Sequence, residues 1–398
     1  MTDLFASLTG AAAPLTLARV ADGFLPLLLA DLARASDTRL LFIAPDESAM
    51  QGICDAARYF APELDCLRFP AWDCLPYDRS SPSMRASAER LATLAALQLP
   101  PRRGTLIVTT AGAIAQRTLT PFRVRQISAA LAAGTRIDRD KLIMMLSANG
   151  YARTDAVADQ GEFAVRGSII DLFPAGESTG IRVDFFGDEI ETIRRFDPAD
   201  QRSLGGIDRF ALLPVSEALL DDDSIRRFRT GYRDHFGAAS TGDPLYQAVS
   251  AGRRQSGMEH WLPLFEERLV TLFDHIDPAT PVLRAHRSDA AITARFDAIA
   301  DYHANRSAAE AGDQSGYRPL APETLYLTPA EWRKAAKARP IHLVTPHAVA
   351  EASTVIDVGT IAARDFTAER ARCDNVYAAV AAHAAEQRAS GRRMIIAS

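Results

Sequence analysis

Residues 161–203 constrain the fold more than any other stretch of this chain, because they predict short strands joined by tight turns. Phe163 and Val165 alternate with more polar neighbours, and this period of two is typical of a half-buried strand. We expect the strand to continue to Leu172. The alternation breaks on the way, which indicates a bulge at Gly167.

Two further strands are predicted over residues 181–186 and 189–196. Gly187-Asp188 lies between them, and glycine accepts the positive φ angle that a hairpin turn requires. Residues 181, 183 and 185 are apolar, whereas residues 182 and 184 are charged. The stretch therefore predicts a small antiparallel sheet with one buried face.

Phe186 is an apolar residue on the polar face of this predicted sheet, in step with Arg182. If Phe163 and Val165 are buried, Arg166 also points outward. Two arginines and an exposed phenylalanine are typical of the anchor residues of a protein interface. The alternative is that Phe186 covers a sheet edge or packs under a helix, and that the arginines are only solvated.

The stretch also resembles a known family, in the runs RGSIIDLFP, RVDFFGDEIETIRRFDP and QRS. They resemble the UvrB-type interaction domain, which occurs in the excision-repair protein UvrB and in the transcription-repair coupling factors (Mfd). In those proteins the domain is the surface that docks onto UvrA. The resemblance implies that Arg166, Arg182 and Phe186 form a UvrA-binding face. It carries over no catalytic, cofactor-binding or metal-binding residue.

Outside this stretch, strands that alternate with helices predict an α/β sheet. The expected strands cover residues 40–44, 66–69, 105–109, 269–273, 281–283, 341–344 and 394–397. The expected helices cover residues 15–35 (interrupted or kinked at Pro26), 45–59, 84–97, 111–117, 139–148, 225–236 and 368–390, and residues 307–317 are expected to connect elements flexibly.

The first strand-to-helix turn excludes a nucleotide-binding P-loop. Such a loop reads GxxxxGK[ST], because glycine backbone amides and a lysine hold the phosphates. Here residues 44–48 are Ala-Pro-Asp-Glu-Ser, with two carboxylates where a polyphosphate would sit. None of the three lysines, Lys141, Lys334 and Lys337, follows a glycine. We therefore expect no nucleotide cofactor and no ATPase activity in this chain.

Two more runs are similar to the coupling factors: FPAWDCLPYD at residues 69–78, followed by SP and RLATL, and GMEHWLPLF at residues 257–265. UvrB itself needs the P-loop, so its absence favours the coupling factors. Trp72 and Tyr77 are expected to pin an extended, proline-rich loop to the α/β domain. A binding role for Trp72 is the alternative.

The predicted fold class is α/β: a degenerate P-loop, UvrB-like α/β domain with an inserted antiparallel-sheet domain, followed by the start of a further α/β domain. The expected domains are residues 1–122 (domain 1a, without Walker A), 123–214 (the α+β UvrA-interaction domain), 215–350 (domain 1b) and 351–398 (a linker and a truncated third domain). The resemblance implies that an intact coupling factor continues into an RNA-polymerase-binding domain and a motor that moves along double-stranded DNA.

Composition excludes several other classes. The net charge of −5 provides no basic field for nucleic acid. The four cysteines form no CxxC pair, so we expect reduced, structural thiols and no metal. Glu259-His260 matches neither orientation of a zinc-protease motif. No signal peptide is indicated, and a cytoplasmic monomer is expected.

The favoured hypothesis is a non-enzymatic adaptor that recruits UvrA to a stalled RNA polymerase in nucleotide excision repair. The rival is a UvrB-like, ATP-dependent repair enzyme. A third hypothesis, a nucleic-acid binder that uses scattered arginines, predicts DNA binding with a strong dependence on salt.

Overall fold

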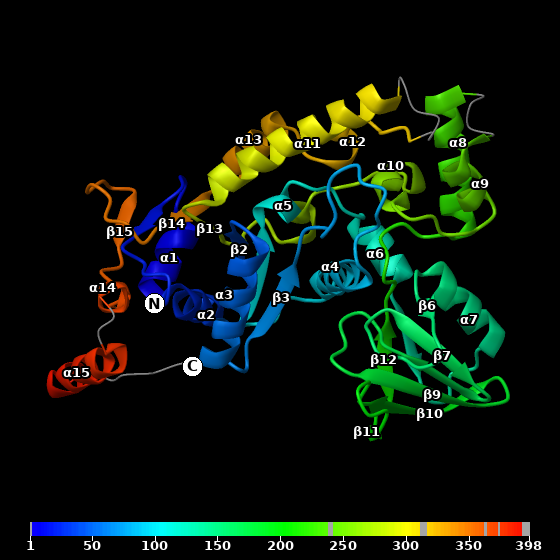
Figure 1. The fold of residues 1–398 in the computed structure, drawn as a ribbon, viewed down its shortest axis with the longest axis horizontal. Coiled ribbons are helices and arrows are strands. Elements are labelled where there is room, and N and C mark those ends of the chain that lie inside the picture. The colour runs from blue at the N-terminus through cyan, green and yellow to red at the C-terminus, as the bar shows by residue number, and fades with distance from the viewer. Residues whose placement is uncertain (1, 238–241, 311–316, 362–363, 373–374, 392–398) are drawn as a thin grey trace.

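The computed structural model describes residues 2–237, 242–310, 317–361, 364–372 and 375–391. It contains a seven-stranded sheet, a six-stranded sheet and a two-stranded ribbon. Figure 1 shows the six-stranded sheet at the lower right, away from the seven-stranded one. The mixed α/β fold that the sequence predicts is confirmed.

The seven-stranded sheet is parallel throughout, in the order β15-β1-β14-β13-β2-β4-β3. Its strands are β1 (Thr16–Ala18), β2 (Arg39–Ala44), β3 (Asp65–Phe69), β4 (Thr105–Thr110), β13 (Val282–Ala285), β14 (Ile341–Val344) and β15 (Val355–Asp357). Every residue of β2 and β4 is buried. These nearly continuous apolar runs are typical of central strands that are covered on both faces.

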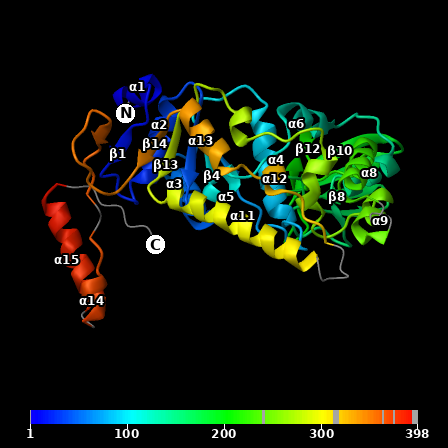
Figure 2. The ribbon, with the colours of Figure 1, turned by 90° about the horizontal axis from the view of Figure 1, so that it is seen from above.

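Helices cover both faces of the parallel sheet. The helices of the described chain as a whole are α1 (Thr2–Gly10), α2 (Leu25–Ala35), α3 (Glu47–Phe60), α4 (Met84–Leu97), α5 (Ala111–Ile114), α6 (Pro121–Ile127), α7 (Arg139–Ala148), α8 (Asp222–Phe236), α9 (Pro244–Ser250), α10 (Leu262–Phe265), α11 (Ser288–Glu310), α12 (Pro322–Leu325), α13 (Pro329–Ala338), α14 (Thr367–Ala371) and α15 (Val376–Ala389), with 3-10 helices η2 (Met258–Trp261) and η3 (Leu272–His275). Helices α2 and α3 pack on one face, and α4, α5 and α11 on the other. Figure 2 shows α14 and α15 at the end of the molecule opposite the six-stranded sheet. Among the described residues, no helix has the length and apolar character needed to cross a bilayer.

The six-stranded sheet belongs to a segment inserted between α6 and α8. Its order is β11-β10-β9-β8-β7-β6, and only the β6–β7 pair is parallel. The strands are β6 (Ala152–Arg153), β7 (Glu162–Arg166), β8 (Ile169–Leu172), β9 (Gly180–Phe186), β10 (Glu189–Phe196) and β11 (Ser203–Gly206). The chain enters and leaves this inserted segment through a two-stranded antiparallel ribbon of β5 (Ala129–Ala132) and β12 (Arg209–Leu212). Helix α7 covers the inner face of the sheet.

Helix α4 lies between the inserted segment and the parallel sheet. Its leucines at 91, 94 and 97 pack into the core of the α/β domain. Its alanines at 88, 92 and 95 pack against the core of the inserted segment. The two elements pack closely here. A Cβ added to Gly176 would lie only 3.1 Å from the Cβ of Ala92, which is tighter than an ordinary contact. One amphipathic helix therefore serves two cores.

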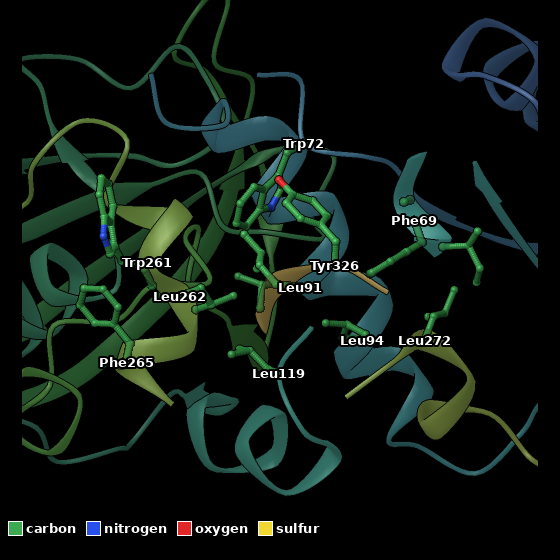
Figure 3. Close-up of a cluster of buried hydrophobic side chains, with 14 of the residues drawn as sticks. Phe69, Trp72, Leu91, Leu94, Leu119, Trp261, Leu262, Phe265, Leu272 and Tyr326 are labelled. Atoms are coloured by element: carbon green, nitrogen blue, oxygen red, sulfur yellow. The ribbon is translucent and has the colours of Figure 1, made fainter. Parts of the chain in front are cut away.

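A buried ion pair joins the end of the inserted segment to α4. The Arg90 Nε donates to Oε1 of Glu217 over 2.6 Å, and both side chains have no exposed area. The indole Nε1 of Trp72 donates to the same carboxylate oxygen over 2.8 Å. The Arg90 Nη1 donates to the carbonyl oxygen of Pro70 over 2.8 Å. Trp72 lies in the hydrophobic core drawn in Figure 3, as its predicted packing role requires.

Two predictions near the sheet were wrong. Residues 15–35 do not form one helix, because Thr16–Ala18 is a strand between β14 and β15. Helix α2 begins only at Leu25, with Pro26 in its first turn, where proline leaves no helical hydrogen bond unmade. Residues 269–273 form no strand either: Val270 makes an isolated bridge to Thr118, and η3 follows.

The C-terminal part differs from the expected linker and long helix. Strand β15 lies beyond the boundary placed at residue 350, yet it pairs with β1 in the parallel sheet. The helix expected over residues 368–390 is divided into α14 and α15. The strand expected over residues 394–397 lies outside the described residues, as does much of the connection expected at 307–317.

Candidate partner-binding face

Two tight hairpins form the candidate face. In the first, Arg166 pairs with Ile169, so Gly167 and Ser168 form a two-residue turn. The bulge predicted at Gly167 is therefore wrong. A glycine with φ of +62° reverses the chain there and divides the predicted strand into β7 and β8. In the second hairpin, Phe186 pairs with Glu189, as expected for a turn at Gly187-Asp188.

The two faces of this sheet differ as the alternation predicts. On β9, residues 181, 183 and 185 are buried against α7 and the inner core. The residues at 182 and 184 are half-buried on the other face, and Phe186 is exposed. Directly paired residues share a face, so Arg166, Ile169, Asp184 and Thr192 form one row across four strands. We call this side the outer face.

Phe186 is the most exposed large apolar residue of the inserted segment among the described residues, with 78% of its surface accessible. It is the last residue of β9, directly before the turn at Gly187. The alternative, that it packs under a helix, does not describe this structure. An aromatic side chain held this open is a strong candidate for an interface anchor.

Arg166 is exposed near the Gly167 turn. Its Nη2 donates to the carbonyl oxygen of Asp155 over 3.0 Å. Within the described chain, no carboxylate lies in ion-pair range of its guanidinium. The strand of Arg166 is two strand spacings, about 10 Å, from the strand of Phe186. One partner surface can therefore reach both side chains.

Arg182 is held in a different way. Its Nε and Nη2 donate to the two carboxylate oxygens of Asp171 over 2.7 and 2.9 Å. Its guanidinium also lies 5.0 Å from the ring centroid of Phe196. The Asp171 side chain is 1% exposed and that of Arg182 is 20% exposed. These hydrogen bonds raise the pKa of Arg182, so it is a fixed cation with one accessible edge.

Arg194 also belongs to the outer face, although the sequence reasoning missed it. It pairs with Arg182 and is exposed. A register shift between Ile190 and Thr192 brings it to this side. The sequence contained the signal: Ile190 and Ile193 both pack into the inner core, and two residues three positions apart share a face only where the strand is irregular.

The first strand-to-helix turn of the α/β domain is filled by carboxylates. The Asp46 side chain accepts a hydrogen bond from the backbone N–H of Ala49 and caps α3. The Glu47 Oε1 accepts from the backbone N–H of Ala71 over 2.8 Å and from the hydroxyl of Thr110 over 3.0 Å. Burial raises the pKa of Glu47. This turn offers acceptors where a phosphate needs donors.

Glu259 and His260 have structural roles. The Glu259 carboxylate accepts hydrogen bonds from Ser81, Ser216 and Arg254. The His260 ring packs against Trp72, and burial lowers its pKa to about 4, which keeps the ring neutral. Across the part of the chain that the structure describes, no three His, Cys, Asp or Glu residues are grouped to hold a metal ion.

Comparison with known proteins gives a family for the inserted segment. The family described as the UvrB interaction domain matches residues 129–217. A transcription-repair-coupling factor of Haemophilus influenzae is 34% identical over 266 residues, 66% of this chain and 23% of that protein. The Escherichia coli protein of the same name is 33% identical over 279 residues, 68% of this chain and 24% of its own length. That of Rickettsia bellii is 28% identical over 362 residues, 90% of this chain.

The chain is a homologue of transcription-repair coupling factors and carries a UvrB interaction domain. The domain covers the ribbon β5–β12, α7, both hairpins and Glu217. All the residues of the outer face lie within it. The chain spans about a quarter of the length of the first two coupling factors.

Proposed function

We propose that this chain is the UvrA-docking module of a transcription-repair coupling factor. The observation that carries the proposal is the exposed Phe186, on the same face as Arg166, Arg182 and Arg194, within a UvrB interaction domain. In this proposal Phe186 fills an apolar pocket of UvrA. Arg166 and the open edge of Arg182 bind acidic or carbonyl groups around that pocket.

A titration of the chain with purified UvrA tests the proposal directly. Saturable 1:1 binding, measured by calorimetry, is the expected result. Because the face carries three arginines, the association rate should fall as salt rises. Absence of binding to UvrA at low and moderate salt would overturn the proposal.

We expect Arg182 to contribute fully to UvrA binding only while Asp171 holds its guanidinium in place. In an Asp171→Ala variant the guanidinium is no longer fixed, so it must be ordered when UvrA binds. Such ordering costs about 1 kcal/mol, and we expect the Kd to rise about fivefold. Asp171→Asn, which keeps one acceptor oxygen, is the matched control and should lose less. Equal binding by wild type and Asp171→Ala would show that the pair has no part in docking.

The second candidate function, ATP hydrolysis of the UvrB kind, predicts nucleotide binding. We expect an equilibrium titration with labelled ATP and magnesium to give no saturable binding, because Asp46 and Glu47 fill the turn with acceptors. UvrB, which has the P-loop, is the positive control. Saturable binding that ATP analogues compete for would contradict the adaptor assignment.

Contacts with RNA polymerase and double-stranded DNA belong, in this proposal, to other parts of a coupling factor. The chain spans only 23% of the Haemophilus influenzae protein that it matches. The role proposed for it is therefore limited to bringing UvrA to the complex.

A further inference from the structure

A groove of about 790 Å³ lies between the α/β domain and the inserted segment. Residues of β3 and α4 line it from the α/β domain, and β12 with residues 175–178 line it from the inserted segment. No residue of the outer face lines it, so the groove is separate from the proposed UvrA-docking surface. Its size and its place at a junction between two domains are typical of sites that bind small organic molecules.

The groove is largely apolar, and it is open because the side chains along it are small. The alanines at 92, 95 and 96 line it from α4. Residues three and four apart are neighbours on a helix surface, so these alanines form one patch. Ala211 lines the groove from β12, and Leu99 lines it with 59% of its surface accessible. A flat apolar group lying on this patch would shield it from water, which is favourable.

Most charged side chains around the groove are already paired. The ion pairs are Arg58 with Asp55, Arg68 with Glu89, and Glu177 with Arg195. Arg125 is different: among the described residues, no carboxylate lies in ion-pair range of its guanidinium. It is exposed and lines the groove. The groove therefore carries one positive charge that no side chain of the described residues compensates.

A chain of hydrogen bonds from the core holds Arg125 in place. The Nε2 of His275 lies 2.9 Å from the carbonyl oxygen of Leu119, which can only accept, so Nε2 carries the proton. Burial lowers the pKa of His275 and keeps the ring neutral, so its Nδ1 accepts from the Nε2 of Gln98 over 3.0 Å. This orientation leaves the Oε1 of Gln98 to accept from the Nη1 of Arg125 over 3.0 Å. One N–H of the guanidinium is used, and the others remain for a ligand.

We propose that this groove binds an organic anion, whose flat apolar body lies on the alanines of α4 and whose single acidic group pairs with Arg125. A guanidinium held in one orientation can donate two parallel hydrogen bonds to a carboxylate or sulfonate. A cation would be repelled by Arg125. A nucleotide polyphosphate fits less well than a monoanion, because Arg58 and Arg68 are already paired.

A fluorescence titration of the full chain with two probes tests the acidic group of the ligand. Anilinonaphthalene sulfonate is an apolar monoanion, and phenylnaphthylamine has the same rings without the sulfonate. We expect saturable binding of one sulfonate per chain, about tenfold tighter than binding of the uncharged probe, as is typical for one charge-assisted pair. Arg125→Ala should remove this difference, and Arg125→Lys should keep part of it. Arg58→Ala is the matched control and should keep all of it, because that guanidinium lines the groove but is paired with Asp55.

A second pair of variants tests the place where the probes bind. Ala211 is exposed on β12, so Ala211→Phe should fill the groove without disturbing the core, and both probes should bind at least about tenfold more weakly. Ala211→Ser keeps the groove open and should bind like wild type. The proposal fails if Arg125→Ala keeps the advantage of the sulfonate, or if Ala211→Phe binds both probes as wild type does. Neither measurement involves UvrA, so neither outcome bears on the docking proposal.

Discussion

Phe186→Ala is expected to weaken UvrA binding about thirtyfold or more, because losing a central interface anchor typically costs about 2 kcal/mol. Phe186 is 78% exposed, so its removal should leave the free energy of unfolding of the chain nearly unchanged. Arg166→Ala should weaken binding to a similar degree, since its exposed guanidinium donates to the carbonyl oxygen of Asp155 through Nη2 and can still pair with a partner carboxylate. Calorimetric Kd values against UvrA measure both effects.

Two exposed residues of the same domain serve as matched controls for this prediction. Met144 is 63% exposed on α7, which covers the opposite face of the sheet. The Arg202 side chain is 84% exposed, and its ion pair with Asp200 is at the surface. Alanine at either position should leave the Kd within about twofold of wild type. If the controls weaken binding as much as Phe186→Ala does, or Phe186→Ala binds like wild type, the outer face is not the docking surface.

Glu217→Ala should lower the free energy of unfolding by about 3–5 kcal/mol, the largest stability change expected in this chain. Without the carboxylate, Arg90 remains fully buried with a carbonyl oxygen and the ring of Phe69 as partners. The indole of Trp72 also loses its acceptor. Urea unfolding followed by tryptophan fluorescence measures the change.

Two comparisons separate the buried charge from a general loss of contacts. Removing Glu63, which pairs with Arg34 while 62% exposed, should leave the unfolding midpoint nearly unchanged. A double variant, Arg90→Met with Glu217→Leu, should recover much of the loss, because it leaves no unpaired charge in the core. An unfolding midpoint unchanged by Glu217→Ala would mean that the buried ion pair contributes no net stability.

Local pattern was enough to predict part of the fold and of the candidate face. The alternation over residues 181–186 placed Phe186 outward, and the structure agrees. Helix α4, helix α7 and β14 have the bounds that their apolar periods and caps predict. In each case the determining contacts lie within a few residues along the chain.

Register between strands could not be predicted. A bulge and a tight turn at Gly167 both explain the broken alternation, but only the turn pairs Asp171 with Arg182. The sequence pattern therefore did not predict the ion pair with Asp171 that holds Arg182 in place. Thr16–Ala18 was misread for a similar reason: its partners β14 and β15 lie more than three hundred residues away. No local period reports such a distant neighbour.

The ribbon that carries the inserted domain has one more consequence. Ala129 and Leu212 are opposite each other in the β5–β12 pair, so the two ends of the domain meet within about 5.5 Å. Because its two ends are adjacent, such a segment can be inserted into a loop of another protein without distorting the backbone of that protein. On the host side, α4 meets the segment mainly through its small alanines, so few large apolar side chains of that helix depend on the contact. The same inserted domain can thus be carried by host domains that differ in function.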